Sequence, residues 1–90
     1  ASAIRLAIGP NPTRSAVVAH ASLPDGSGAT ASAGNVNGRV LRSWHLGRTS
    51  GDVELVWDLR DEHGNAVPAG VYWLRVQSGS SRITRSVVVR

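Results

Sequence analysis

Glycine, serine, proline and asparagine interrupt this chain about every ten residues, so that only short runs of β-prone residues remain between them. No window of a dozen residues repeats apolar positions at intervals of three and four, as an amphipathic helix would. Regular spacing of short runs between turn residues is typical of an all-β sandwich or barrel. The interruptions therefore exclude a helical or mixed fold.

Seven such runs can be placed in the sequence. They are residues 4–8, 16–22, 29–36, 39–46, 53–57, 71–77 and 82–89. Asn37-Gly38, between the third and fourth runs, is a dipeptide that favours a tight hairpin turn. Seven strands in a chain of 90 residues predict a seven-stranded antiparallel immunoglobulin-like β-sandwich, formed by a single domain over residues 1–90.

Composition limits the kinds of molecule that this chain can be expected to bind. The net charge of +4 comes from arginine alone, because the chain contains no lysine. These arginines are scattered among apolar residues and do not form a stripe with stacking aromatics, so we expect no nucleic-acid binding. Cysteine is absent, and no apolar run approaches the length of a membrane span. We expect no disulfide, no cofactor and no membrane-spanning segment.

The segment from Trp57 to Tyr72 reads W-D-x-x-D-x-x-G-x-x-V-P-x-G-x-Y. It resembles the immunoglobulin-like domain first named for the flagellar hook-capping protein, which recurs at the C-termini of bacterial secreted and surface proteins. Residues 35–41 are similar to the D-x-x-G-R-x-V hairpin of these domains. The resemblance marks the following residues as the structural motif: Pro10, Asn11, Pro12, Gly38, Trp57, Asp58, Asp61, Gly64, Pro68, Gly70 and Tyr72.

Two features at the ends of the chain are shared with type IX secretion C-terminal sorting domains. Residues 10–13 resemble their P-N-P opening, and residues 86–90 resemble their last strand. The resemblance implies a C-terminal domain of a larger exported bacterial protein, located outside the cell or on its surface. Because the chain starts at Ala1 without methionine, we expect it to be a piece of a longer precursor whose targeting signal lies upstream.

The turn over residues 58–70 is rich in oxygen-bearing side chains. Asp58 and Asp61 can each accept hydrogen bonds from backbone N–H groups two or three residues on, which would pin the turn. Gly64 and Gly70 suit positions of positive φ. The alternative is calcium, a cation that prefers such oxygen ligands, although their spacing does not match an EF-hand loop. Its ligands would be Asp58, Asp61, Glu62 and Asn65.

The third run contains unusually small residues, among them Ala31, Ala33 and Gly34. Small side chains leave a void unless larger ones face them, so we expect Trp44 or Trp57 to fill the space. In the sixth run, alternation points Tyr72, Leu74 and Val76 inward and leaves Val71 and Trp73 on the opposite face. Those two residues form the candidate interaction surface, unless flanking arginine stems cover the tryptophan.

Catalysis is not expected. The histidines at positions 20, 45 and 63 have no paired spacing, and no glycine-flanked nucleophile elbow is present. The preferred interpretation is a non-catalytic accessory module that docks, spaces or assembles its parent protein. The first alternative is a type IX sorting or anchoring domain, and the second is an extracellular subunit that self-assembles through edge strands. The partners would be neighbouring domains, other protein subunits or secretion machinery.

Overall fold

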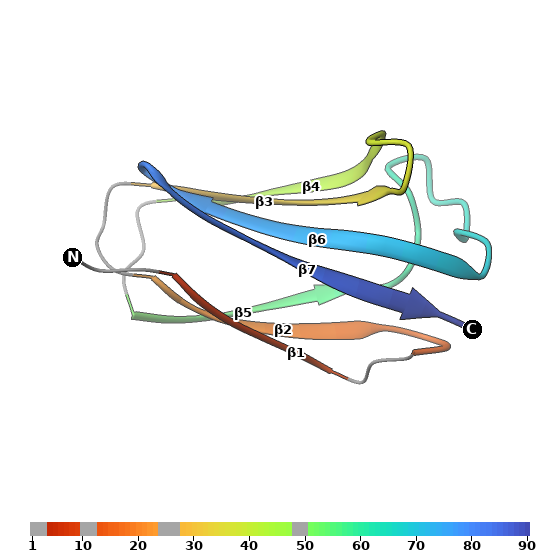
Figure 1. The fold of residues 1–90 in the computed structure, drawn as a ribbon, viewed down its shortest axis with the longest axis horizontal. Coiled ribbons are helices and arrows are strands. Elements are labelled where there is room, and N and C mark those ends of the chain that lie inside the picture. Colours follow the sequence, from red (N-terminus) through yellow and green to blue (C-terminus); the bar gives the residue numbers. More distant parts are fainter. Residues whose placement is uncertain (1–3, 10–12, 24–27, 48–50) are drawn as a thin grey trace.

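The computed structural model describes residues 4–9, 13–23, 28–47 and 51–90, and it is an all-β sandwich (Figure 1). Its strands are β1 (Arg5–Gly9), β2 (Val17–Leu23), β3 (Ala29–Asn35), β4 (Val40–Gly47), β5 (Gly51–Trp57), β6 (Gly70–Ser78) and β7 (Ser81–Val89). The prediction of seven antiparallel strands in a sandwich is confirmed. In this described part of the chain, no helix is long and apolar enough to cross a membrane.

The strands form two facing sheets. One sheet has the order β1-β2-β5, and the other has the order β4-β3-β6-β7, with every neighbouring pair antiparallel. The chain passes from one sheet to the other after β2, after β4 and after β5 (Figure 1). The last passage is the turn over residues 58–70, so this segment connects the two layers.

A short parallel contact joins the two sheets along one side. Thr13, which follows β1, forms a parallel bridge with Val89. Its N–H donates to the Val88 carbonyl at 2.8 Å, and its own carbonyl accepts from the Arg90 N–H at 2.8 Å. Thr13 is only 2% exposed. β7 is therefore held on both sides near its end, by β6 and by the segment after β1.

The core lies between the sheets and is built from alternate residues of the strands. In β6, Tyr72, Leu74 and Val76 are buried, whereas Val71 is exposed on the opposite face, as the alternation predicts. The buried apolar side chains of the whole core are Ile4, Leu6, Val17, Ala19, Ala21, Leu23, Ala29, Ala31, Ala33, Leu55, Trp57, Leu59, Tyr72, Leu74, Val76, Val87 and Val89.

Strand boundaries differ from prediction mainly in β5, which begins at Gly51 because its ladder with β2 extends to the Leu23–Gly51 pair. In β4, a register shift between Ala33 and Gly34 leaves Leu41 as an extra residue. Ala31 lies opposite Trp44, whose indole packs against the core. A large residue thus faces a small one on the inner side of this sheet.

The expectation that Trp44 or Trp57 fills the space beside all three small residues is wrong for Gly34. A Cβ built on Gly34 would point to the outer face and overlap the Trp73 ring. Position 34 requires glycine because the Trp73 ring lies across it on the outer face of the sheet. A void in the core is not the reason for this small residue. A close contact within one sheet explains the glycine.

Replacing Trp57 by alanine should destabilise the domain by about 3–5 kcal/mol, because this side chain is 1% exposed and its removal leaves a large cavity. Val56→Ala is the matched control, since Val56 is the neighbouring residue and is 50% exposed. Chemical denaturation of both variants measures the difference. Similar losses at the two positions would contradict this assignment of the inner and outer faces of β5.

Candidate functional site

Two aromatic residues hold the ends of the 58–70 turn. Trp57 ends β5, Tyr72 lies near the start of β6, and their rings meet edge to face with centroids 5.7 Å apart. The indole N–H of Trp57 donates to the Arg60 carbonyl at 3.0 Å, and the Tyr72 hydroxyl donates to the Pro68 carbonyl. Burial raises the pKa of the Tyr72 phenol, which favours the protonated donor form. Each ring thus packs in the core while its polar atom binds the turn.

Leu59 is the residue in this turn that sequence reasoning missed. It has a φ of 61° and yet is 5% exposed, so a bulky residue adopts the left-handed conformation to bury its side chain. Its carbonyl accepts a hydrogen bond from the Val67 N–H at 2.8 Å. Positive φ in a leucine has no reliable sequence signal, because glycine or asparagine would normally mark such a position.

The two aspartates of the turn accept backbone hydrogen bonds. Oδ1 of Asp58 accepts from the Arg60 N–H at 3.1 Å. Oδ1 of Asp61 accepts from the N–H groups of His63 and Asn65 at 2.9 and 3.0 Å. These donors lie two and four residues beyond their acceptors. Both carboxylates therefore fix the local backbone, as Asx-type turns do.

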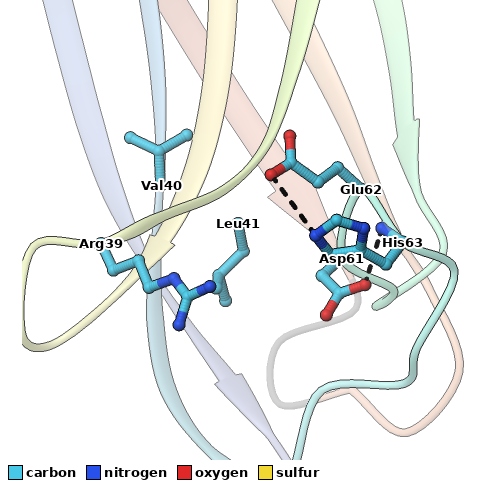
Figure 2. Close-up of a pocket in the computed structure, with 6 residues that line it drawn as sticks. All are labelled: Arg39, Val40, Leu41, Asp61, Glu62 and His63. Carbon is cyan, nitrogen blue, oxygen red and sulfur yellow. Dashed lines mark hydrogen bonds and ion pairs between the residues drawn. The ribbon is translucent and has the colours of Figure 1, made fainter.

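Further contacts tie the turn to β4. The guanidinium of Arg42 lies 3.2 Å from the Asp58 carboxylate, and the Glu62 N–H donates to the Leu41 carbonyl at 3.0 Å. The space between the turn and β4 is a shallow pocket of about 80 Å³ (Figure 2). It is lined by Arg39, Val40, Leu41, Asp61, Glu62 and His63. The turn is thus anchored to the edge strand of the four-stranded sheet.

The proposed calcium ligands do not gather around one point. Asp58 binds Arg42, whereas Asp61 binds the backbone N–H groups of His63 and Asn65 in the middle of the turn. Glu62 lies 3.9 Å from the imidazole of His63. Among the residues that the structure describes, no group of three or more His, Cys, Asp or Glu side chains could hold a metal ion. The carboxylates of Asp58 and Asp61 bind the backbone of the turn itself.

The remaining motif residues differ in how much the structure says of them. Pro10, Asn11 and Pro12 lie outside the described residues. Gly38 closes the β3–β4 hairpin with a φ of 83°, and Gly64 has a φ of 84° in the long turn. Asn35 organises that hairpin, because its Oδ1 accepts from the N–H groups of Asn37 and Arg39 at 3.1 Å each. The motif residues described here stabilise turns.

Trp73 lies on the outer face of the four-stranded sheet, half-buried over Gly34. Its indole N–H donates to the Asn35 carbonyl at 2.7 Å, and the Arg75 guanidinium lies 4.9 Å from its ring centroid. Arg75 in turn donates to the Thr84 hydroxyl at 3.1 Å. Trp73 is therefore fixed in place by a hydrogen bond, a close backbone contact and a cation–π contact. Val71, its partner in the candidate surface, is 50% exposed.

The pH dependence of stability should report on Asp61. Hydrogen bonding from the Asn65 N–H, and then from the His63 N–H, lowers the pKa of this carboxyl below 3.8, helped by the charges of His63 and Arg39. A carboxyl with a lowered pKa in the folded state stabilises it above the unfolded pKa, and this contribution disappears as the pH falls through the folded value. Asp61→Asn should therefore flatten the decrease in melting temperature below about pH 4.

The melting temperature also distinguishes hydrogen bonding by the turn carboxylates from metal binding. With the wild-type chain at neutral pH, EDTA and added calcium should both leave the melting temperature unchanged, because the Asp61 oxygen is engaged by backbone donors. A melting temperature that falls in EDTA and recovers with calcium would show that the turn binds the ion instead.

Gly34→Ala should destabilise the domain by about 1–3 kcal/mol, because the new methyl group would overlap the Trp73 ring and the Arg39 carbonyl. Gly9→Ala is the control, since its added Cβ would meet nothing within 4 Å. In a double-mutant cycle, Trp73→Ala should recover part of the Gly34→Ala loss. Simple additivity of the two losses would show that the ring does not limit residue 34.

Comparison with known proteins gives similarity at the level of structure. Neither a protein family nor a curated protein matches the sequence. Dimeric latent PorU from Porphyromonas gingivalis is similar to this chain with a TM-score of 0.75 over 96% of its residues, at 22% identity. PorZ, an essential bacterial surface component of the type-IX secretion system of the same organism, is similar with a TM-score of 0.69 over 94%, at 25% identity. The chain spans 9% of PorU and 11% of PorZ, and these likenesses agree with the immunoglobulin-like sandwich.

Proposed function

We propose that this chain is a non-catalytic immunoglobulin-like module of an exported bacterial protein, and that it docks or spaces its parent at the surface of a cell with a type IX secretion system. The observation that carries the proposal is the similarity to PorZ, which extends over 94% of the chain. Because that similarity covers 11% of PorZ, the proposal concerns a module and not the activity of a whole protein.

The arrangement of the ionisable side chains supports a non-catalytic role. His20 lies on β2, His45 on β4 and His63 in the long turn, and all three are exposed. The pocket beside the turn measures about 80 Å³, and a second hollow on the β1-β2-β5 face measures about 170 Å³. Sites that enclose a small-molecule substrate usually measure roughly 300 Å³ or more. The polar side chains described above act in turns and in packing.

A sorting or anchoring domain of the type IX system is the second candidate. The similarity to PorZ agrees with this role as well as with docking, because PorZ is itself a component of such a system. The P-N-P segment at residues 10–12 also resembles sorting domains, whereas the segment from Trp57 to Tyr72 resembles the hook-capping type. The two candidates differ in whether the module carries its parent across the outer membrane.

Fusing the module behind a periplasmic reporter, in a host with type IX machinery, tests both candidates. A docking module should leave the reporter in the periplasm, folded, and crosslinking should join it to the parts of that machinery that face the periplasm. A sorting domain should deliver the reporter to the cell surface. The matched control is Leu74→Asp, which puts a charge at a fully buried position and should abolish either behaviour by unfolding the module.

Two results of the fusion experiment would change the proposed function. Surface delivery by the wild-type fusion, absent in a host without the machinery, would move sorting to first place. A folded reporter that stays in the periplasm and crosslinks to no component of the system would overturn the type IX proposal altogether.

A further inference from the structure

The outer face of the four-stranded sheet carries an apolar patch with a basic border. Val71 and Val40 are each 50% exposed, and Val36, in the turn between β3 and β4, is 73% exposed. Val40 lies opposite Gly34, which itself lies opposite Trp73, so these side chains share one face. We call the group formed by Val36, Val40, Val71 and Trp73 the valine–tryptophan patch. The three valines are exposed, whereas Trp73 is half-buried with the Arg75 guanidinium over its ring. Exposed apolar side chains gathered around an aromatic residue mark an interaction surface.

Positive charge continues this face away from the patch. Arg75 follows Trp73 two residues along β6, and the next outward pair is Gln77 with Arg82 of β7. None of the four strands β3, β4, β6 and β7 contains an aspartate or a glutamate. Along the strands, the face therefore reads apolar at Trp73, then basic at Arg75 and at Arg82.

The outer face of the three-stranded sheet carries the complementary sequence. On β5, the outward residues Val56, Glu54 and Asp52 follow one another at intervals of two, and all three are exposed. Val56 is 50% exposed, and the Glu54 side chain is 61% exposed. This row reads apolar, acidic, acidic. Since the step of two residues is the same on both faces, each residue of one row can lie over its complement in the other.

The two rows also run in the same direction. β5 ends at Trp57, next to Val56, and β7 ends at Val89, opposite the start of β6 near Val71. Both strand ends lie at the same end of the sandwich (Figure 1). A second molecule stacked without reversal can therefore be positioned with Val56 over Trp73, Glu54 over Arg75, and Asp52 over Arg82.

The acidic face is also hollowed where an arginine would arrive. A shallow depression of about 170 Å³ lies on the β1-β2-β5 sheet, and Asp52, Ser22 and Arg5 are among its lining residues. Ser22 of β2 lies between Arg5 of β1 and Asp52 of β5, so the basic and acidic residues line opposite sides of the depression. An exposed Arg82 side chain from a neighbouring molecule can therefore enter it on the Asp52 side, away from Arg5.

We propose that the occupant of the valine–tryptophan patch is a second copy of this chain, bound through the outer face of its β1-β2-β5 sheet. Two identical faces cannot pair, because Arg75 and Arg82 would meet arginines, and Glu54 and Asp52 would meet carboxylates. Only unlike faces match, so the contact is heterologous and continues from molecule to molecule as an open stack. The proposal stands whether or not the type IX assignment holds, and it uses sheet faces rather than edge strands.

Sedimentation equilibrium of the 90-residue chain tests the proposal. The average mass should rise above the monomer value of 9.4 kDa as the protein concentration increases. Raising the salt from about 0.05 M to about 0.5 M should reverse the association, because the paired charges are exposed and screened. A chain that stays monomeric at low salt up to near-millimolar concentration would overturn the proposal.

Charge-reversal variants identify the faces. Glu54→Arg and Arg82→Glu should each lower the association constant about ten-fold or more, since each places like charges across the contact. Arg14→Glu makes the same change in charge as Arg82→Glu at an exposed position outside all seven strands, and it should associate like the wild type. An equal loss of association in this control would show that the effect depends on net charge alone, and would overturn the assignment of the faces.

Mixing the two charge-reversal variants provides the decisive test. The Glu54→Arg variant keeps the basic face intact, and the Arg82→Glu variant keeps the acidic face intact, so an equimolar mixture should associate more strongly than either variant alone. A variant that had merely unfolded would not recover on mixing. Failure of two folded variants to associate together would overturn the proposed contact.

Discussion

The contact between Trp57 and Tyr72 is the interaction on which the other features depend. One ring belongs to the three-stranded sheet and the other to the four-stranded sheet, so their edge-to-face packing joins the two layers. The same residues lie just outside the two ends of the long turn and bind its carbonyls through their polar atoms. Core packing and turn geometry therefore depend on the same two side chains. Loss of either ring would affect the layers and the turn together.

With this contact in place, the rest of the turn needs only local support. The carboxylates of Asp58 and Asp61 satisfy backbone donors, and Leu59 returns a side chain to the core despite its positive φ. The ion pair of Arg42 with Asp58 then ties the turn to β4. Oxygen-rich turns of this kind resemble calcium loops in composition. Here one oxygen of Asp58 and one of Asp61 accept backbone N–H groups, so hydrogen bonding to the backbone accounts for both carboxylates.

The sequence predicted the strands, their alternation and the inward direction of Tyr72, because hydrophobic periodicity is a local property. It could not predict that Gly34 is required by Trp73, since these residues are far apart in the chain and meet only after β3 pairs with β6. For the same reason, the row of Val56, Glu54 and Asp52 became meaningful only when its position relative to Arg75 and Arg82 was known. Pairing between distant segments of the chain decides these contacts, and short-range sequence patterns do not encode such pairing.

The parallel contact of Thr13 with the end of β7 has a mechanical consequence. β1 begins at one end of the sandwich and β7 ends at the other, so tension between the two ends of the domain acts along the strands (Figure 1). The two hydrogen bonds of Thr13 to residues 88 and 90 would then be strained together, in shear, instead of opening one after the other. Resistance to pulling depends on the rate of unfolding rather than on equilibrium stability. A small domain held together by such hydrogen bonds can transmit force between protein segments joined to its two ends.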